Sequence, residues 1–592
     1  MSQPGDTLLP SAAGRATAAA APPLRTAVRT AALALAVSGG LGPLLLSDAG
    51  SLTTLFFRAQ DAPWLAVCGL ALLIATALPA RGVAVAWTEA ALSRPGPVSA
   101  LAAAFAIASA LVGTILVMRC FPLSYDEVMA EFDTAILRQG RLVAAVAPEW
   151  RPFANSLVPF FRLPVAGDAA WVSSYLPGNA ALRALMATVH GEAWTGPLLA
   201  GISALATYRI ARRLWPERPD AAAVAVILLA TSPQVLVTAM TPYSMTAHLA
   251  LNLVWLSLFL RNDRAGHLGA VSVGFLACGL HQVVFHPLFV GPFVLQLLGR
   301  RRWGLVLFYV LAYGMIGAFW VEYWGLALAW SDVASEIAVQ AGPGLFLERV
   351  LEILRWPSLE AVDLMAKNLL RFVAWQNPLA LPLAVLAGVA IRRAEGITRP
   401  LLAGVLITAG AAFLLMPYQG HGWGYRYLHG AIGSLCLLAA RGWIGVTCDA
   451  ASRRAALPVL AAATIFSAAI LLPGRLHQVA RFVWPYADAV EAIRRAPADV
   501  VVVDPSGMAF GADLVRNDPF LRNRPIVLGL QSLSEAALRS ICGRFRVALF
   551  DRRHGAAYGI GGAGPSLESS PGHAMVDSLG CAEPLPLPPD AR

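Results

Sequence analysis

Two adjacent carboxylates, Asp126 and Glu127, are the residues whose type and position most suggest chemistry. They follow an apolar run, 98–118, that is long enough to cross a bilayer. Acids at a membrane surface are costly unless they are paired or functional. A carboxylate can take the proton from an attacking hydroxyl, and two acids can hold a divalent cation. The structural alternative for Asp126 is to cap the helix that follows.

A second polar cluster lies in a turn between two later apolar runs, Gln419-Gly-His-Gly-Trp-Gly-Tyr-Arg-Tyr-Leu-His429. Glycines let a backbone approach a ligand closely, and a guanidinium can hold a phosphate through two parallel hydrogen bonds. Arg426 is therefore a candidate phosphate-binding residue, with His421 and Tyr425 beside it. A lipid headgroup or an acidic loop residue is the alternative partner of Arg426.

Two histidines, His281 and His286, lie between two short apolar runs within Gly279-Leu-His-Gln-Val-Val-Phe-His-Pro287. A spacing of five residues does not put both rings on one helix face, so a zinc pair is disfavoured. We expect these side chains to line a polar cavity on the same side of the membrane as Asp126.

The surrounding sequence is that of a polytopic α-helical membrane protein. Of its 592 residues, 57% are hydrophobic and only 14% are charged, against about a quarter charged in soluble proteins. The net charge of +10 comes from arginines scattered between apolar runs, which argues against nucleic-acid binding. We expect about 13 transmembrane helices, at 28–46, 63–80, 98–118, 191–208, 221–239, 246–260, 268–280, 283–299, 303–322, 378–391, 400–417, 428–447 and 455–473.

The arginine clusters give a check on this topology. With the spans above, every cluster falls on one side of the membrane, which the positive-inside rule assigns to the cytoplasm. Three long segments then lie outside: 119–190, 323–377 and 474–592. The N-terminus is expected in the cytoplasm and the C-terminus outside it. We interpret the first apolar run as an uncleaved helix, with a signal peptide as the alternative.

The expected parts follow this topology. They are a disordered cytoplasmic N-terminus at 1–24, N-terminal transmembrane helices at 25–118, an extracytoplasmic catalytic loop at 119–190, a transmembrane core at 191–473 with an outer amphipathic segment at 323–377, and a small extracytoplasmic α/β domain at 474–592. In the last part, strands are predicted at 500–504, 525–528 and 546–550 and helices at 486–496 and 533–541. A disulfide between Cys542 and Cys581 is one option there.

The acidic pair begins a predicted helix that runs to Arg138 and stops at Gly140. In it, Asp126, Ala130 and Asp133 share one face, while Glu127 and Glu131 share a neighbouring one.

These motifs, in this order, resemble the GT-C superfamily of polyprenyl-phosphate-sugar-dependent glycosyltransferases. The similarity is to the ArnT/PMT-like group, which includes lipid A aminoarabinose transferases and protein O-mannosyltransferases. The matching motifs are Asp126-Glu127, Gly140-Arg-Leu142, Tyr175-Leu-Pro-Gly178, Gly424-Tyr-Arg-Tyr427 and Asn517-Asp-Pro519. Two features depart from the family: three spans precede the acidic pair, so that 1–97 is an addition, and His286-Pro287 stands where many members carry Arg-Pro.

The resemblance implies an inverting hexosyl- or pentosyltransferase of the bacterial plasma membrane. Its donor would be a polyprenyl-phosphate-linked sugar, and its acceptor an envelope lipid, glycan or protein on the extracytoplasmic face. Asp126 would be the general base, Glu127 its neighbour, and Arg426 with His421 would hold the leaving phosphate. Tyr175, His281, His286 and Tyr425 complete the expected substrate-binding set. No cofactor is implied beyond a divalent cation on Asp126 and Glu127, which the sequence leaves open.

Two other functions remain alternatives at this stage. A membrane transporter or lipid flippase would more often show repeated halves and charged or broken helices at mid-membrane, and the sequence has no convincing repeat. An envelope assembly protein that keeps the fold without activity is the other.

Overall fold

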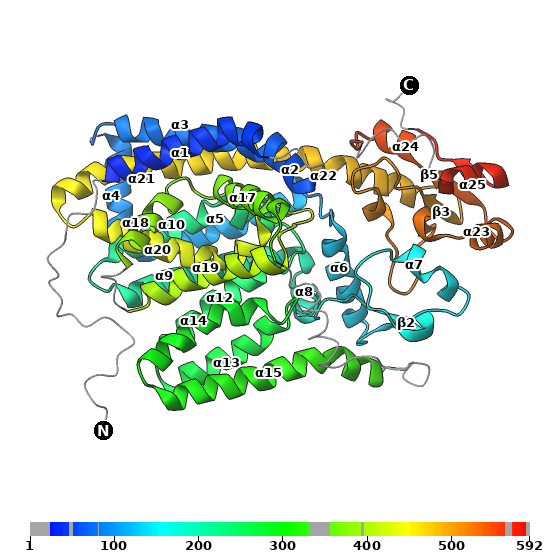
Figure 1. The fold of residues 1–592 in the computed structure, drawn as a ribbon, viewed down its shortest axis with the longest axis horizontal. Helices are drawn as coiled ribbons and strands as arrows, with labels where there is room; N and C mark the ends of the chain where they lie inside the picture. Colours follow the sequence, from blue (N-terminus) through cyan, green and yellow to red (C-terminus); the bar gives the residue numbers. More distant parts are fainter. Residues whose placement is uncertain are drawn as a thin grey trace.

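The computed structural model describes residues 24–46, 51–80, 82–331, 356–391, 396–562 and 571–587. Most of the described chain forms a bundle of helices, and the smaller part gathers at one end of it (Figure 1). The bundle helices are α1 (Leu24–Leu45), α2 (Leu52–Phe56), α3 (Ala62–Ala77), α4 (Val83–Ser93), α5 (Pro95–Leu116), α9 (Thr195–Leu214), α10 (Pro219–Ala230), α11 (Pro233–Thr238), α12 (Met245–Phe259), α13 (Arg264–Cys278), α14 (Phe285–Gly299), α15 (Trp303–Ala329), α17 (Leu359–Ala374), α18 (Ala380–Val389), α19 (Thr398–Leu415), α20 (Ile432–Val446), α21 (Ala450–Phe466) and α22 (Leu472–Arg494).

Six helical stretches in the described part are long and apolar enough to cross a membrane: Leu24–Leu45, Leu52–Ala77, Pro95–Leu116, Trp303–Ala329, Thr398–Leu415 and Ala450–Arg494. Shorter apolar helices, α10, α12, α14 and α18 among them, pack between these. The chain is therefore a multi-pass membrane protein by length and composition, while the expected number of 13 crossings stays a prediction.

Helices α1 and α3 pack with their backbones in contact, because each of the two helices places a glycine against the other. A Cβ atom on Gly39 would lie 2.6 Å from the Ala62 carbonyl oxygen, and one on Gly69 would lie 2.5 Å from the Ala32 carbonyl oxygen. Small residues at such crossings let membrane helices gain close van der Waals packing. Gly39 and Gly69 are thus part of the surface through which these two helices pack.

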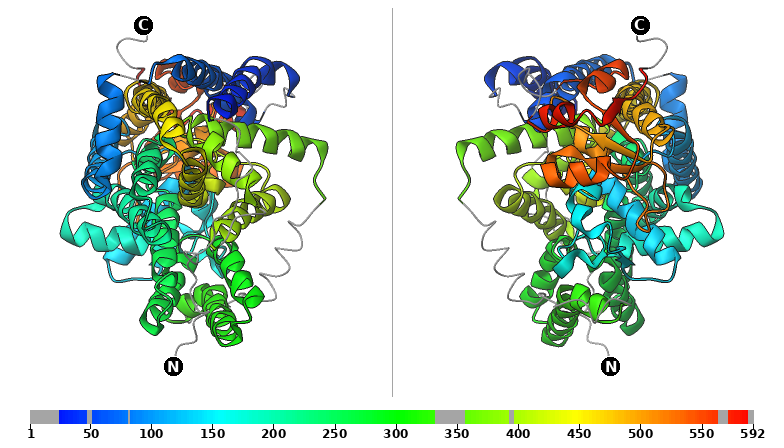
Figure 2. Two further views of the ribbon diagram at one scale, coloured as in Figure 1. Left: turned by 90° about the vertical axis from the view of Figure 1, so that its left-hand side faces the viewer. Right: turned by 90° about the vertical axis from the view of Figure 1, so that its right-hand side faces the viewer.

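The smaller part combines the segment after α5 with the C-terminal strands. Its helices are α6 (Tyr125–Arg138), α7 (Ala154–Leu157), α8 (Gly178–Val189), α23 (Glu535–Cys542), α24 (Arg552–Ala557) and α25 (Pro571–Leu579). Its strands are β1 (Ala144–Ala145), β2 (Ala170–Trp171), β3 (Val500–Val503), β4 (Ile526–Gly529), β5 (Val547–Phe550) and β6 (Ala582–Pro584). The right-hand view of Figure 2 shows the C-terminal elements and the segment around α6 together at this end.

The last four strands form a parallel sheet in the order β4-β3-β5-β6. Val500 pairs with both Ile526 and Val547, and all four residues of β3 are buried. Continuous apolar strands of this kind are typical of parallel sheets covered on both faces. The three predicted strands and the helix at 533–541 are present, and Cys542 is bonded to Cys581.

Three expectations about the bundle need adjustment. Helix α22 runs through residue 474, so the expected boundary there lies inside a continuous helix. Helix α15 continues past its expected end at 322. The segment 323–377 was expected to lie along the membrane surface, but its residues 332–355 are outside the described residues. In its later part, helix α17, Lys367 and Arg371 are buried in the protein and do not face a membrane surface. The disorder expected at 1–24 falls almost entirely outside the described residues.

The α1–α3 contact predicts opposite outcomes for two adjacent glycines. A Gly39→Ala substitution should lower the free energy of unfolding by about 1–3 kcal/mol, because its methyl group meets backbone atoms that cannot move aside. Gly40→Ala is the matched control, since a Cβ there has no neighbour within 4 Å. Thermal unfolding of the purified protein in detergent measures both, and equal midpoints for the two variants would contradict the close contact.

Candidate active site

Helix α6 begins at Tyr125 and places its two acids in different surroundings. The Glu127 carboxylate turns back and accepts hydrogen bonds from the backbone N–H groups of Leu123 and Ser124, and the side chain is fully buried. This is a reciprocal cap of the helix start. Burial, only partly offset by those hydrogen bonds, raises the pKa of Glu127 to about 8. Glu127 is therefore a structural cap and does not face a cavity.

Asp126 is one half of a buried ion pair. Its Oδ2 atom lies 2.5 Å from Nη1 of Arg426, and its Oδ1 atom accepts a hydrogen bond from the Tyr175 hydroxyl. The side chains of Asp126 and Arg426 are only 11% and 10% exposed. Burial alone would raise the pKa of Asp126, but the charge of Arg426 and the hydrogen bond from Tyr175 outweigh it and hold that pKa below its usual value.

Arg426 keeps hydrogen-bonding capacity beyond this pair. Its guanidinium carbon lies 5.3 Å from the centre of the Tyr243 ring and 5.5 Å from that of Tyr427. Its Nε–H group is buried and has no hydrogen-bond partner in the described part of the chain. Such a guanidinium can bind an additional anion while it keeps some of its present contacts.

The loop before Arg426 is fixed by one side chain and one glycine. The Gln419 side chain accepts a hydrogen bond from the Arg426 backbone N–H (2.8 Å) and donates one to the Gly424 carbonyl (2.9 Å). Gly424 has φ +69°, and a Cβ there would lie 2.8 Å from the side chain of Gln234. Any other residue would be strained at this position, which explains why a glycine stands two residues before Arg426 in the sequence.

A buried charge cluster that the sequence analysis missed supports the same loop. Asp61 accepts hydrogen bonds from Arg371, Arg475 and the Trp375 indole, at 2.8, 3.0 and 2.6 Å. Arg371 in turn donates to the Gly422 carbonyl at 2.9 Å. Asp61 stands two residues before the apolar run expected at 63–80, and this acid beside an apolar run was the available signal.

The ion pair lies between two cavities of different character. The cavity on the Asp126 side, of about 330 Å³, is polar in part, and we call it the Asp126 cavity. Its lining residues are Asp126, Ala130, Asp133, Ser173, Tyr175, Leu176, Asn179, Ala180, Tyr243, Ser244, Leu280 and His281. The three residues predicted to share one face of the helix all contribute to it.

The cavity on the other side, of about 460 Å³, is the Arg426 cavity. It is lined by Met245, His248, Asn252, Phe285, Phe289, Thr408, Arg426, Tyr427, Gly430 and Ala431, mostly from the apolar helices α12, α14 and α19 and the turn before α20. The guanidinium of Arg426 is the only Arg or Lys side chain among these lining residues. The cavity therefore suits an apolar chain that ends in an anion.

The structure brings together some of the predicted site residues. Tyr175 and Arg426 contact Asp126 directly, and the His281 ring stacks on Tyr175 with centroids 4.0 Å apart. Burial lowers the pKa of His281 to about 4, against a smaller opposing effect of Asp126, so this imidazole is neutral near pH 7.

Three other predicted residues lie elsewhere. His286 is fully buried, hydrogen-bonded to Asn252 and Tyr313, and lines neither cavity. His421 packs behind the loop, with its ring 5.4 Å from that of Phe482. The backbone carbonyl of Tyr425 accepts a hydrogen bond from Gln234, and its ring is buried. In the described structure these side chains pack around the site, and their expected part in substrate binding stays a prediction.

The acidic pair does not fit a shared divalent cation. Asp126 points to Arg426 and Tyr175, whereas Glu127 points to the backbone of Leu123 and Ser124. Within the described residues, no group of three His, Cys, Asp or Glu side chains has the arrangement of a metal site.

The cap of Glu127 predicts a pH-dependent stability. Because its folded-state pKa of about 8 exceeds its ordinary value of 4.5, folding retains a proton that the unfolded chain has released. Stability should therefore fall as pH rises from about 5 to 8, by up to about 1.4 kcal/mol per unit of pKa difference. Glu127→Gln keeps an acceptor oxygen but cannot titrate, so its thermal midpoint should fall less over this range. Glu535→Gln, at an exposed acid, is the control, and parallel slopes for wild type and Glu127→Gln would contradict the raised pKa.

Comparison with known proteins yields similarity only among solved structures. No protein-family model and no curated protein matches the sequence. The chain is similar to a crystal structure of ArnT from Cupriavidus metallidurans bound to undecaprenyl phosphate, at 16% identity and a TM-score of 0.47, over 72% of this chain and 85% of that one. It is also similar to the apo state of the same protein, at 15% identity and a TM-score of 0.45, over 71% and 84%. ArnT is of the group that the sequence motifs resemble.

Proposed function

We propose that this protein is an inverting glycosyltransferase that moves a sugar from a polyprenyl-phosphate donor to an envelope acceptor. The observation that carries the proposal is the buried Asp126–Arg426 pair between an apolar cavity and a polar one. A transfer reaction needs an anion-binding group on the donor side and a base on the acceptor side. The pair supplies one of each at contact distance.

The donor is assigned to the Arg426 cavity. Its apolar lining suits part of a polyprenyl chain, and Arg426 with its unpartnered Nε–H group suits the phosphate. The sugar would then extend past the ion pair toward the Asp126 cavity. Tyr175 and neutral His281 lie there as hydrogen-bonding groups for hydroxyls.

The proposed reaction is a single displacement. A hydroxyl oxygen of the acceptor attacks the anomeric carbon, and its proton passes to the Asp126 carboxylate. The bond between the anomeric carbon and the phosphate oxygen breaks on the opposite face, and the polyprenyl phosphate leaves with the electron pair. Configuration at the anomeric carbon is inverted, and no covalent intermediate with the enzyme forms.

Donor binding would itself activate the base. In the free protein, Arg426 holds the pKa of Asp126 below its usual value, which makes the carboxylate a weak base. A phosphate that binds Arg426 competes for the guanidinium and adds negative charge nearby, and both effects raise the pKa of Asp126. We therefore infer that the donor binds before the acceptor proton is removed.

We propose that this chemistry takes place on the extracytoplasmic face of a bacterial plasma membrane, the side that the positive-inside rule favours. In that topology the N-terminus is cytoplasmic, and the C-terminal sheet lies outside, above the site.

Replacing the base should abolish transfer. With a polyprenyl-phosphate donor carrying a radiolabelled sugar, membranes containing Asp126→Asn should transfer label about 10²–10⁴-fold more slowly than wild type. Asp488→Asn, at an exposed acid paired with Arg119, is the control and should transfer normally. Normal transfer by Asp126→Asn at equal expression would refute the base assignment. Label that crosses the membrane while still attached to the polyprenyl phosphate would indicate a flippase.

Replacing the phosphate-binding group should act mainly on the donor. Arg426→Ala should raise the KM for the donor more than the KM for the acceptor, because the lost charge lies in the donor cavity. Arg426→Lys should recover part of the affinity, since it restores the charge without the planar fork. An unchanged donor KM in Arg426→Ala would contradict the assignment.

The coupling between donor and base predicts two different pH profiles. The profile of kcat/KM for the donor reports free enzyme, in which Arg426 lowers the pKa of Asp126. The pH profile of kcat reports the complex of enzyme and donor, in which the donor phosphate raises the pKa of Asp126. The acid limb of kcat should therefore lie at higher pH than that of kcat/KM. Coincident limbs would show that the donor does not weaken the ion pair.

A further inference from the structure

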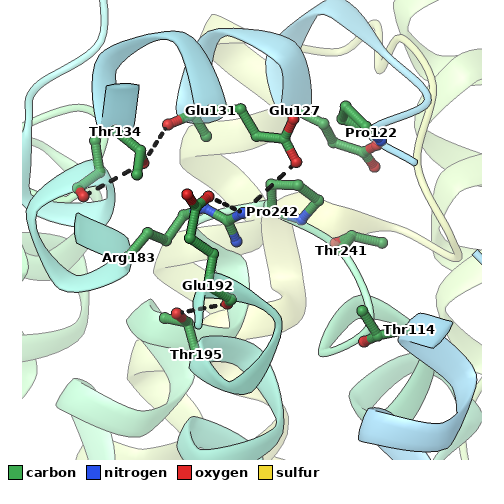
Figure 3. Close-up of polar contacts among 12 residues, drawn as sticks. Thr114, Pro122, Glu127, Glu131, Thr134, Arg183, Glu192, Thr195, Thr241 and Pro242 are labelled. Carbon is green, nitrogen blue, oxygen red and sulfur yellow. Dashed lines mark hydrogen bonds and ion pairs between the residues drawn. The ribbon is translucent and has the colours of Figure 1, made fainter. Parts of the chain in front are cut away.

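A third cavity, of about 580 Å³, lies beside α6, α8 and the ends of α5 and α9. We call it the Glu131 cavity. Its lining residues are Thr114, Cys120, Phe121, Glu131, Arg183, Glu192, Ala193, Gly196, Ala239, Met240, Thr241 and Pro242. Figure 3 shows Arg183, from α8, between Glu131 of α6 and Glu192. The proposed transfer reaction uses none of these side chains.

Of the charged side chains that line this cavity, Glu131 and Glu192 are acidic and Arg183 is basic, and their hydrogen-bonding capacity is not all used. Nη2 of Arg183 lies 3.2 Å from Glu192 and 3.6 Å from Glu131, and Arg138 also pairs with Glu192. These four side chains have no net charge. The side chain of Arg183 is only 8% exposed, and its buried Nε–H group has no hydrogen-bond partner among the described residues.

Glu131 is the complementary group. Its carboxylate is 38% exposed and lies 3.6 Å from Nη2 of Arg183, an ion pair beyond hydrogen-bond distance. The cavity thus presents an available carboxylate and an available guanidinium N–H within one contact of each other. A neutral ligand with one cationic and one anionic group matches this arrangement.

The position of the cavity, at the end of a helix long enough to cross a membrane, indicates that the ligand carries hydrocarbon. On α5, the last turn of a helix long enough to cross a membrane exposes 64% of Leu116. On α8, Leu185 and Val189 are each 62% exposed. Phe121 and Met240 form part of the wall itself. Acyl chains of a bilayer lipid would cover these surfaces, whereas a small soluble ligand would leave them in water.

We propose that the Glu131 cavity binds the headgroup of a zwitterionic aminophospholipid, with its ammonium group on Glu131 and its phosphate on the guanidinium of Arg183. The acyl chains then run along α5 and α8 into the bilayer. This site is separate from the transfer reaction, and its test does not require activity. Because Glu131 and Asp126 belong to the same helix, the bound lipid fixes α6 at the membrane surface.

Cys120 provides a reporter inside the cavity. Among the five free cysteines, Cys68, Cys278 and Cys436 are buried, and only Cys120 and Cys448 are exposed. In a Cys448→Ser protein, the rate of maleimide alkylation therefore reports access to Cys120. The protein is reconstituted in vesicles of phosphatidylglycerol mixed with either phosphatidylethanolamine or phosphatidylcholine.

Phosphatidylethanolamine should slow alkylation at least about threefold relative to phosphatidylcholine, because occupancy protects the thiol and only the primary ammonium can donate hydrogen bonds to Glu131. Glu131→Gln should remove this difference, while Glu535→Gln, at an exposed acid of α23, should keep it. Equal rates in the two lipids, or slowing that persists in Glu131→Gln, would overturn the proposal. Glycerophosphoethanolamine could also slow the alkylation of Cys120 by the same factor in the detergent-solubilised protein. That result would overturn the assignment of a lipid and indicate that the ligand is a soluble zwitterion.

Discussion

The contact between Asp126 and Arg426 is the constraint on which the rest of the site depends. The two residues are 300 positions apart in the sequence, yet their charged atoms lie 2.5 Å apart in a place with little access to water. A buried charge that loses its partner costs several kcal/mol, whereas a paired one is tolerated. Both elements must therefore be held rigidly, and much of the surrounding structure does this.

Distant parts of the chain supply that rigidity. From the N-terminal helices, Asp61 orients Arg371, which holds the loop before Arg426 through a backbone carbonyl. From the C-terminal part, Arg516 donates hydrogen bonds to the carbonyls of Pro122 and Leu123, immediately before α6. The N-terminal helices are therefore connected to the loop that carries the candidate phosphate-binding residue.

Helix α6 separates two polar cavities because its two faces carry different acids. Asp126 and Asp133 face the Asp126 cavity, and Glu131 faces the cavity beside α5 and α9. Glu127 lies between these faces and closes the start of the helix with its own carboxylate. One short helix thus combines a candidate base, a cap and a candidate lipid contact, and the period of 3.6 residues keeps the three roles apart.

The sequence by itself determined the membrane class, the extent and faces of α6 and the three C-terminal strands, and it singled out Asp126 and Arg426 as candidate site residues. These features depend on local hydrophobicity and periodicity, which short stretches of sequence encode. It gave no basis for the different surroundings of Asp126 and Glu127, for the packing partners of His286 and His421, or for finding Asp61. Only the tertiary structure decided these points, because whether a buried polar side chain faces a cavity or a packing partner depends on residues hundreds of positions away.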